Sequence, residues 1–224
     1  HWKDWPRVFD ATRVRRMAGV NGDILVRSLL LQGIFISFLF LGASLGDVPL
    51  AANQVLLQFL QITAYAMDGF AFGAETLVGQ AMGARRRAAL RRAAWLSSLW
   101  GLGTGAALAL FFALAGAAIV DVMTTAEPVR EAARAYLPWV VLAPLLGAAP
   151  WMLDGIFIGA TRTRDMRNMM AVSAAVYGAA LLVLMPLLGN HGLWAALNIS
   201  FVMRGLTLWL RYPALEADAD RAAA

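Results

Sequence analysis

Three carboxylates lie inside long apolar segments of this chain: Asp68, Glu75 and Asp154. The bilayer core cannot solvate charge, so an acid in a membrane span usually faces a bundle interior or a wet cavity. Asp68 and Asp154 are therefore candidates to bind a proton, a cation or a cationic substrate. A structural ion pair is the alternative for each, with Arg204 as a candidate partner. Glu75, on the same helix face as Asp68, is a structural candidate that we expect to pair with one of the following arginines.

Polar amides add to this chemistry in the first two apolar segments. Gln54, Gln58 and Gln61 follow one another at i, i+4 and i+7, which places them on one face of a helix. A polar stripe of this kind faces a cavity or another helix rather than lipid. Gln32 and Tyr65 are further candidates to line a pocket, and Tyr65 could contact a flat cationic ligand.

Composition places these residues in a membrane protein. The chain has 224 residues, of which 60% are hydrophobic and 15% charged, whereas soluble domains have about 45–50% and about 25%. Absence of cysteine excludes disulfides, thiolate nucleophiles and cysteine metal sites. Six apolar stretches approach the ~20 residues that a membrane-spanning helix requires. We therefore expect an all-α membrane protein with six transmembrane helices, near 24–45, 50–78, 93–120, 132–158, 168–188 and 192–210.

The basic residues predict the orientation of the spans. Of the 19 lysines and arginines, only Arg130 and Arg134 fall on one side of the six spans. Because lysine and arginine accumulate on the cytoplasmic side, both termini are predicted to be cytoplasmic. The +5 net charge thus reflects membrane topology, and no nucleic-acid partner is expected. We divide the chain into a basic interfacial linker (1–23), a six-helix lobe (24–210) and a cytoplasmic tail (211–224).

Glycine spacing predicts where the helices approach one another. Small residues four positions apart let helix backbones pack closely in a membrane. The glycine pairs are Gly42/Gly46, Gly69/Gly73, Gly79/Gly83, Gly101/Gly105 and Gly155/Gly159.

Two segments of the chain are also similar to each other. Residues 67–74 read MDGFAFGA and residues 153–160 read LDGIFIGA, with the aspartates in matched positions.

No enzyme active site is expected. Ser44 lies in a G-x-S-x-G sequence, but that motif needs a strand–turn–helix setting and here it ends a predicted membrane helix. We interpret the motif as a helix-packing glycine pair and His191 as an outer-surface residue. No catalytic residue, metal site or organic cofactor is predicted.

Several motifs resemble one transporter family. Residues 50–55 (LAANQV) and 78–84 (VGQAMGA), the second containing Gly79, Gln80 and Gly83, resemble the C-terminal half of MATE (multidrug and toxic compound extrusion) transporters. Two longer stretches resemble the DNA-damage-inducible, DinF-like branch: AYAMDGFAFGAE and LDGIFIGATRTRDMRN.

The resemblance implies one lobe of a twelve-helix transporter in a bacterial-type inner membrane. Such proteins export small cationic, lipophilic compounds in exchange for H⁺ or Na⁺ by alternating access. The Na⁺-site glutamate of NorM-like members would fall near Leu31 and Gln32, and a second acid near Trp151, where this sequence has none. H⁺ is therefore favoured over Na⁺ as the coupling ion. The partner would be an N-terminal lobe that is missing here, or a second half-transporter.

Two other functions remain open from the sequence. A lipid-linked oligosaccharide flippase would share the architecture but should have a more cationic cavity. A six-span scaffold or assembly protein would not transport, and mutation of its acids would change only stability.

Overall fold

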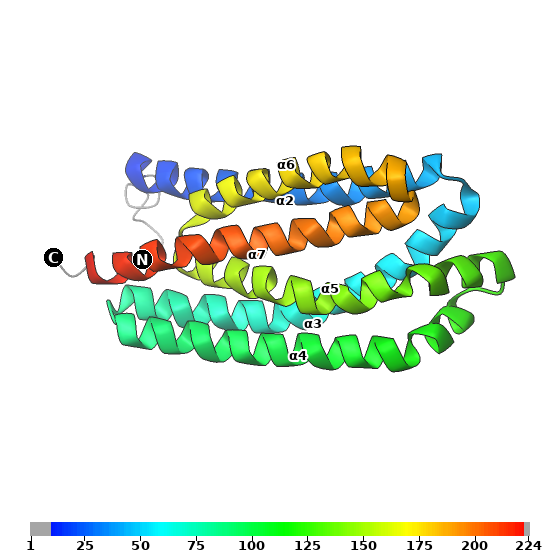
Figure 1. The fold of residues 1–224 in the computed structure, drawn as a ribbon. Helices are drawn as coiled ribbons and strands as arrows, with labels where there is room; N and C mark the ends of the chain where they lie inside the picture. Colours follow the sequence, from blue (N-terminus) through cyan, green and yellow to red (C-terminus); the bar gives the residue numbers. More distant parts are fainter. Residues whose placement is uncertain (1–9, 222–224) are drawn as a thin grey trace, which may run out of the picture.

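Six long helices make up the chain in the computed structural model, which describes residues 10–221. Each contains a segment long and apolar enough to cross a membrane. The helices run alternately up and down in one bundle, and α2 begins at the end of the bundle where α7 finishes (Figure 1). The predicted all-α, six-helix class is confirmed. The helices are α2 (Ala11–Ser44), α3 (Asp47–Gly83), α4 (Arg87–Met123), α5 (Glu127–Gly159), α6 (Thr163–Leu188) and α7 (Asn190–Arg221).

The first and last helices extend beyond the apolar segments. α2 begins at Ala11, not near residue 24, because the Asp10 side chain accepts hydrogen bonds from the backbone N–H groups of Thr12 (2.9 Å) and Arg13 (3.4 Å). That N-cap stabilises the first turn of a helix regardless of hydropathy. Much of the expected linker is thus helical, and its residues 1–9 lie outside the described part.

Ion pairs hold the C-terminal extension of α7 against α4. Glu216, which is buried, lies 3.4 Å from the Nε of Arg87 and 3.8 Å from that of Arg91, both on α4. Residues 211–221 of the expected tail therefore continue the last helix and pack back onto the bundle.

α5 and α7 occupy the centre of the bundle. In their most apolar segments 61% and 56% of residues are buried, against 11% in α2 and in α6. Edge-to-face aromatic pairs fill the core around them, with ring centroids 4.8 Å apart for Phe38 and Trp194 and 5.0 Å apart for Phe59 and Phe112. A charge on α5 or α7 is consequently removed from lipid by the surrounding helices.

Glycines allow the closest helix contacts. A Cβ on Gly155 would lie 2.3 Å from the carbonyl oxygen of Ala71, and one on Gly159 would lie 2.3 Å from that of Glu75. The two similar segments, 67–74 and 153–160, thus contribute to one backbone-to-backbone contact between α3 and α5. By contrast, Gly69 meets nothing within 4 Å, because its face of α3 points away from the bundle.

Candidate functional site

A buried cluster of three charges joins α2, α5 and α7. Asp154 Oδ2 accepts hydrogen bonds from Nη2 of both Arg27 and Arg204. The side chains of Asp154 and Arg204 are 7% and 5% exposed, and that of Arg27 is 16% exposed. The cluster thus links three helices, and removing one of its partners would leave a buried charge uncompensated.

The cluster carries one more positive than negative charge. Two guanidinium groups share a single carboxylate oxygen, and Asp154 Oδ1 is buried without a hydrogen bond in the described structure. The Nε atoms of Arg27 and Arg204 are likewise buried and unbonded. Asp154 is therefore held between fixed cations, which leaves it poorly placed to bind a cationic substrate.

A cavity of about 290 Å³ lies beside the cluster, with Arg204 in its wall. Trp151 and Phe201 form an aromatic side of this cavity, their ring centroids 5.7 Å apart. Two of the glutamines identified in the sequence, Gln32 and Gln61, also line it. The remaining lining residues are apolar: Leu31, Phe35, Leu57, Leu60 and Ala64.

The predicted polar stripe lies on a face of α3 that this lobe does not cover. Gln54, Gln58 and Gln61 are exposed, and Tyr65 is 69% exposed. Of these residues only Gln61 reaches the 290 Å³ cavity. Asp68 continues the stripe, half-buried, and forms no hydrogen bond or ion pair with any described residue.

Within the described part of the chain, Glu75 does not form the expected ion pair. Glu75 is half-buried and has no ion-pair partner among residues 10–219. The following arginines cannot reach back to it because α3 ends at Gly83 and Arg85 turns the chain with a φ of 55°. Its backbone instead contributes to the contact with Gly159.

The Gly79, Gln80 and Gly83 motif shapes the end of α3. A Cβ on Gly79 would lie 3.4 Å from the Gly159 carbonyl oxygen, so this glycine packs against α5. The Gln80 carbonyl accepts a hydrogen bond from the Ala84 N–H at 2.9 Å, whereas its side chain is exposed. Gly83 faces open space. The motif thus forms the C-terminal end of α3 and its contact with α5, and it does not line the 290 Å³ cavity.

Sequence reasoning did not identify Arg27 as a site residue. It was counted only among the basic residues that set topology, although it lies three residues inside the first predicted span. An arginine within an apolar segment is itself a signal for a buried acidic partner.

These features define a polytopic α-helical membrane protein: six spans, a buried charged cluster, and a polar helix face left uncovered. The MatE family model matches residues 24–184, and the chain belongs to this family of MATE transporters.

Curated relatives agree with this assignment. The chain is 44% identical over 209 residues to DNA damage-inducible protein F of Escherichia coli, covering 88% of this chain and 44% of that protein. It is 29% identical over 223 residues to the probable multidrug resistance protein NorM of Bradyrhizobium diazoefficiens, covering 94% and 46%. The chain therefore spans about half the length of the curated relatives it matches.

Solved structures have the same fold. The Vibrio cholerae MATE transporter VcmN in its bent form matches with a TM-score of 0.87 at 16% identity, over 97% of this chain and 50% of that one. A MOP superfamily transporter from Pyrococcus furiosus matches with a TM-score of 0.76 at 16% identity, over 88% and 44%.

Proposed function

We propose that this chain is the C-terminal lobe of a DinF-like multidrug efflux transporter in a bacterial-type inner membrane, with both termini cytoplasmic. The complete transporter exports small cationic, lipophilic compounds by alternating access, in exchange for H⁺. Membership of the MatE family, the names of the two curated relatives and the half-length coverage support this proposal.

The observation that carries the proposal is the state of Asp68. This carboxyl group has no fixed cation beside it in the described structure, and it continues an exposed row of glutamines and a tyrosine on α3. A polar helix face is costly against lipid, so in the membrane it faces a wet cavity or a second lobe. Asp68 is then placed to exchange a proton for a cationic substrate.

Asp154 has a different role in this proposal. Its carboxylate is already bound by Arg27 and Arg204, so it positions α5 between α2 and α7. The same cluster holds Arg204 in the wall of the 290 Å³ cavity. Gln32 and Gln61 supply neutral polar contacts there, which suits a lipophilic ligand with few hydrogen-bonding groups.

The direct test uses the full-length protein in proteoliposomes loaded with a fluorescent lipophilic cation. We expect transport when an H⁺ gradient is imposed, and only background flux with a Na⁺ gradient of equal magnitude. Transport driven by Na⁺ alone would contradict the coupling ion, and absence of flux under both gradients would contradict efflux of this substrate class.

A second candidate is flipping of a lipid-linked oligosaccharide. One observation favours it: the net positive charge of the buried cluster, with Arg204 on the cavity wall, suits an anionic phosphate group. In the same proteoliposomes, a flippase would translocate a fluorescent polyprenyl-diphosphate-linked sugar without moving the lipophilic cation. The efflux proposal predicts the reverse.

A further inference from the structure

A second and larger cavity lies at the arginine-rich end of the bundle. Its volume is about 1430 Å³, and it opens between the first turns of α2 and the corner that joins α5 to α6. Residues 11–26 and 160–167 supply most of its walls, with Met82 and Asp218 completing them. Neither transport proposal uses this cavity.

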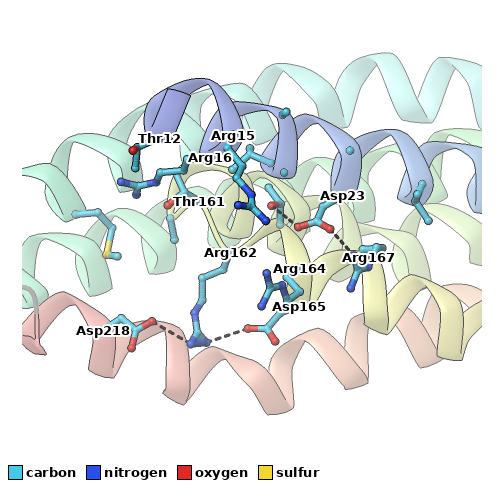
Figure 2. A pocket seen from close by; sticks show the side chains of 18 of the residues that line it. Thr12, Arg15, Arg16, Asp23, Thr161, Arg162, Arg164, Asp165, Arg167 and Asp218 are labelled. Atoms are coloured by element: carbon cyan, nitrogen blue, oxygen red, sulfur yellow. Dashed lines mark hydrogen bonds and ion pairs between the residues drawn. The ribbon is translucent and has the colours of Figure 1, made fainter. Parts of the chain in front are cut away.

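Every acid on the cavity wall already has an arginine partner. Arg162 lies 2.9 Å from Asp165 and 2.9 Å from Asp218, and so joins α6 to α7. Arg167 contacts Asp23 of α2 at 2.6 Å. These ion pairs, drawn as dashed lines in Figure 2, hold the walls of the cavity together.

Three further arginines have no such partner among the residues that the structure describes. Arg15, Arg16 and Arg164 line the cavity, are exposed, and form no ion pair or hydrogen bond with any described residue. Arg15 and Arg16 come from α2 and Arg164 from the start of α6, on the opposite wall (Figure 2). The cavity consequently presents unpaired guanidinium groups from two sides.

Guanidinium groups on two walls of one cavity favour binding of an anion with several acceptor oxygens. A guanidinium group binds phosphate through paired N–H donors, and arginines on opposite walls can bind different oxygens of one phosphate. α6 also begins at Thr163 without a side-chain cap, which adds the positive end of its dipole to the same wall.

The position of the cavity favours a lipid over a soluble phosphate. An exposed apolar surface continues from the cavity along α2, as expected for side chains that contact acyl chains: Val26 in the cavity wall is 43% exposed, and Leu29, three residues further on, is 63% exposed. A phospholipid beside α2 would therefore bring its headgroup to the level of Arg15 and Arg16. A soluble phosphate would gain nothing from this apolar surface.

We propose that this cavity binds the phosphate group of an anionic phospholipid through Arg15, Arg16 and Arg164. The bound lipid links the first turns of α2 to the α5–α6 corner. The inference concerns lipid binding alone and does not depend on the transported substrate or the coupling ion.

Native mass spectrometry of the delipidated full-length protein in a neutral detergent tests this site. Phosphatidylglycerol is titrated against wild type and against the combined variant Arg15→Gln, Arg16→Gln, Arg164→Gln. With about 1 kcal/mol of attraction per surface arginine, we expect affinity to fall roughly fivefold for each arginine removed. The matched control, Arg85→Gln, Arg86→Gln, Arg92→Gln, removes the same charge at the α3–α4 corner, outside the cavity, and should change affinity less than about twofold.

Four outcomes would overturn the proposal. An equal loss of phosphatidylglycerol affinity in both triple variants would mean that the positive charge at this end of the bundle attracts the lipid non-specifically, without a defined binding site. Equal binding of phosphatidylcholine would mean that the anionic charge is not recognised. Glycerol 3-phosphate binding as tightly as phosphatidylglycerol would replace the lipid with a soluble phosphate. If the first triple variant melts below wild type, Arg164→Gln alone is titrated, and unchanged affinity there would also overturn the site.

Discussion

The two similar segments MDGFAFGA and LDGIFIGA place their aspartates in opposite surroundings. Asp154 is buried between two arginines from neighbouring helices, whereas Asp68 is half-buried and has no partner within the described structure. The segments even share one contact, since Gly155 packs on the backbone of Ala71. What differs is coverage: α5 is enclosed by its neighbours, and the Asp68 face of α3 is not. The same local sequence thus provides a structural acid in one helix and an available acid in the other.

The largest effect should come from removing the enclosed acid. Asp154→Leu leaves Arg27 and Arg204 buried without a counter-charge, and we expect a loss of about 3–5 kcal/mol in the free energy of unfolding. Denaturant titration of the chain in detergent measures this free energy. The control combines Arg27→Met, Asp154→Leu and Arg204→Met, which removes all three charges and should recover most of the loss. If Asp154→Leu alone is as stable as wild type, Asp154 does not have the structural role assigned to it.

The next effect concerns the contact between the two segments. Gly155→Ala places a Cβ against the Ala71 carbonyl oxygen and should cost about 1–3 kcal/mol of stability. Gly69→Ala, whose Cβ meets nothing within 4 Å, is the matched control and should be neutral or stabilising by up to about 1 kcal/mol, because alanine is the better helix former. Equal melting of the two variants would show that this α3–α5 contact is not formed.

A smaller effect is expected within the polar stripe. Gln61→Leu removes an amide that lines the 290 Å³ cavity, and we expect the half-saturating drug concentration of the full-length transporter to rise about fivefold. Gln54→Leu alters the same stripe outside the cavity and should change that concentration less than about twofold. The reverse order would place the ligand along the open face rather than in the cavity.

The smallest effect on stability is expected at the available acid. Asp68→Asn breaks no ion pair or hydrogen bond within the described structure. The free energy of unfolding, measured by denaturant titration, should therefore stay within about 0.5 kcal/mol of the wild-type value. A loss as large as that of Asp154→Leu would show that Asp68 has a buried partner and would remove the contrast between the two segments.

Much of the fold could be predicted from the sequence because membrane spans have a simple signal. Apolar stretches of the right length gave the six helices, and Gly155 and Gly159 lie at a helix contact as their spacing predicted. The first turns of α2 were missed because hydropathy does not report a helix that leaves the bilayer, whereas the Asp10 cap does.

The candidate site was less predictable, for a physical reason. Arg204 could be proposed as the partner of an acid, but nothing local distinguishes Asp154 from Asp68, since their surrounding sequences match. Which acid it meets depends on how α7 packs, a long-range property. Arg27 was missed because a basic residue near the end of a span also satisfies the topology rule.

The most direct test of the contrast is proton-driven export by full-length Asp68→Asn in proteoliposomes, measured per folded molecule. Asp47→Asn, which neutralises an exposed acid at the start of the same helix, is the matched control. If Asp68 is the available acid, its variant should fold as wild type does and lose export, while the Asp47 variant exports normally. Undiminished proton-driven export by a folded Asp68→Asn protein would contradict the account.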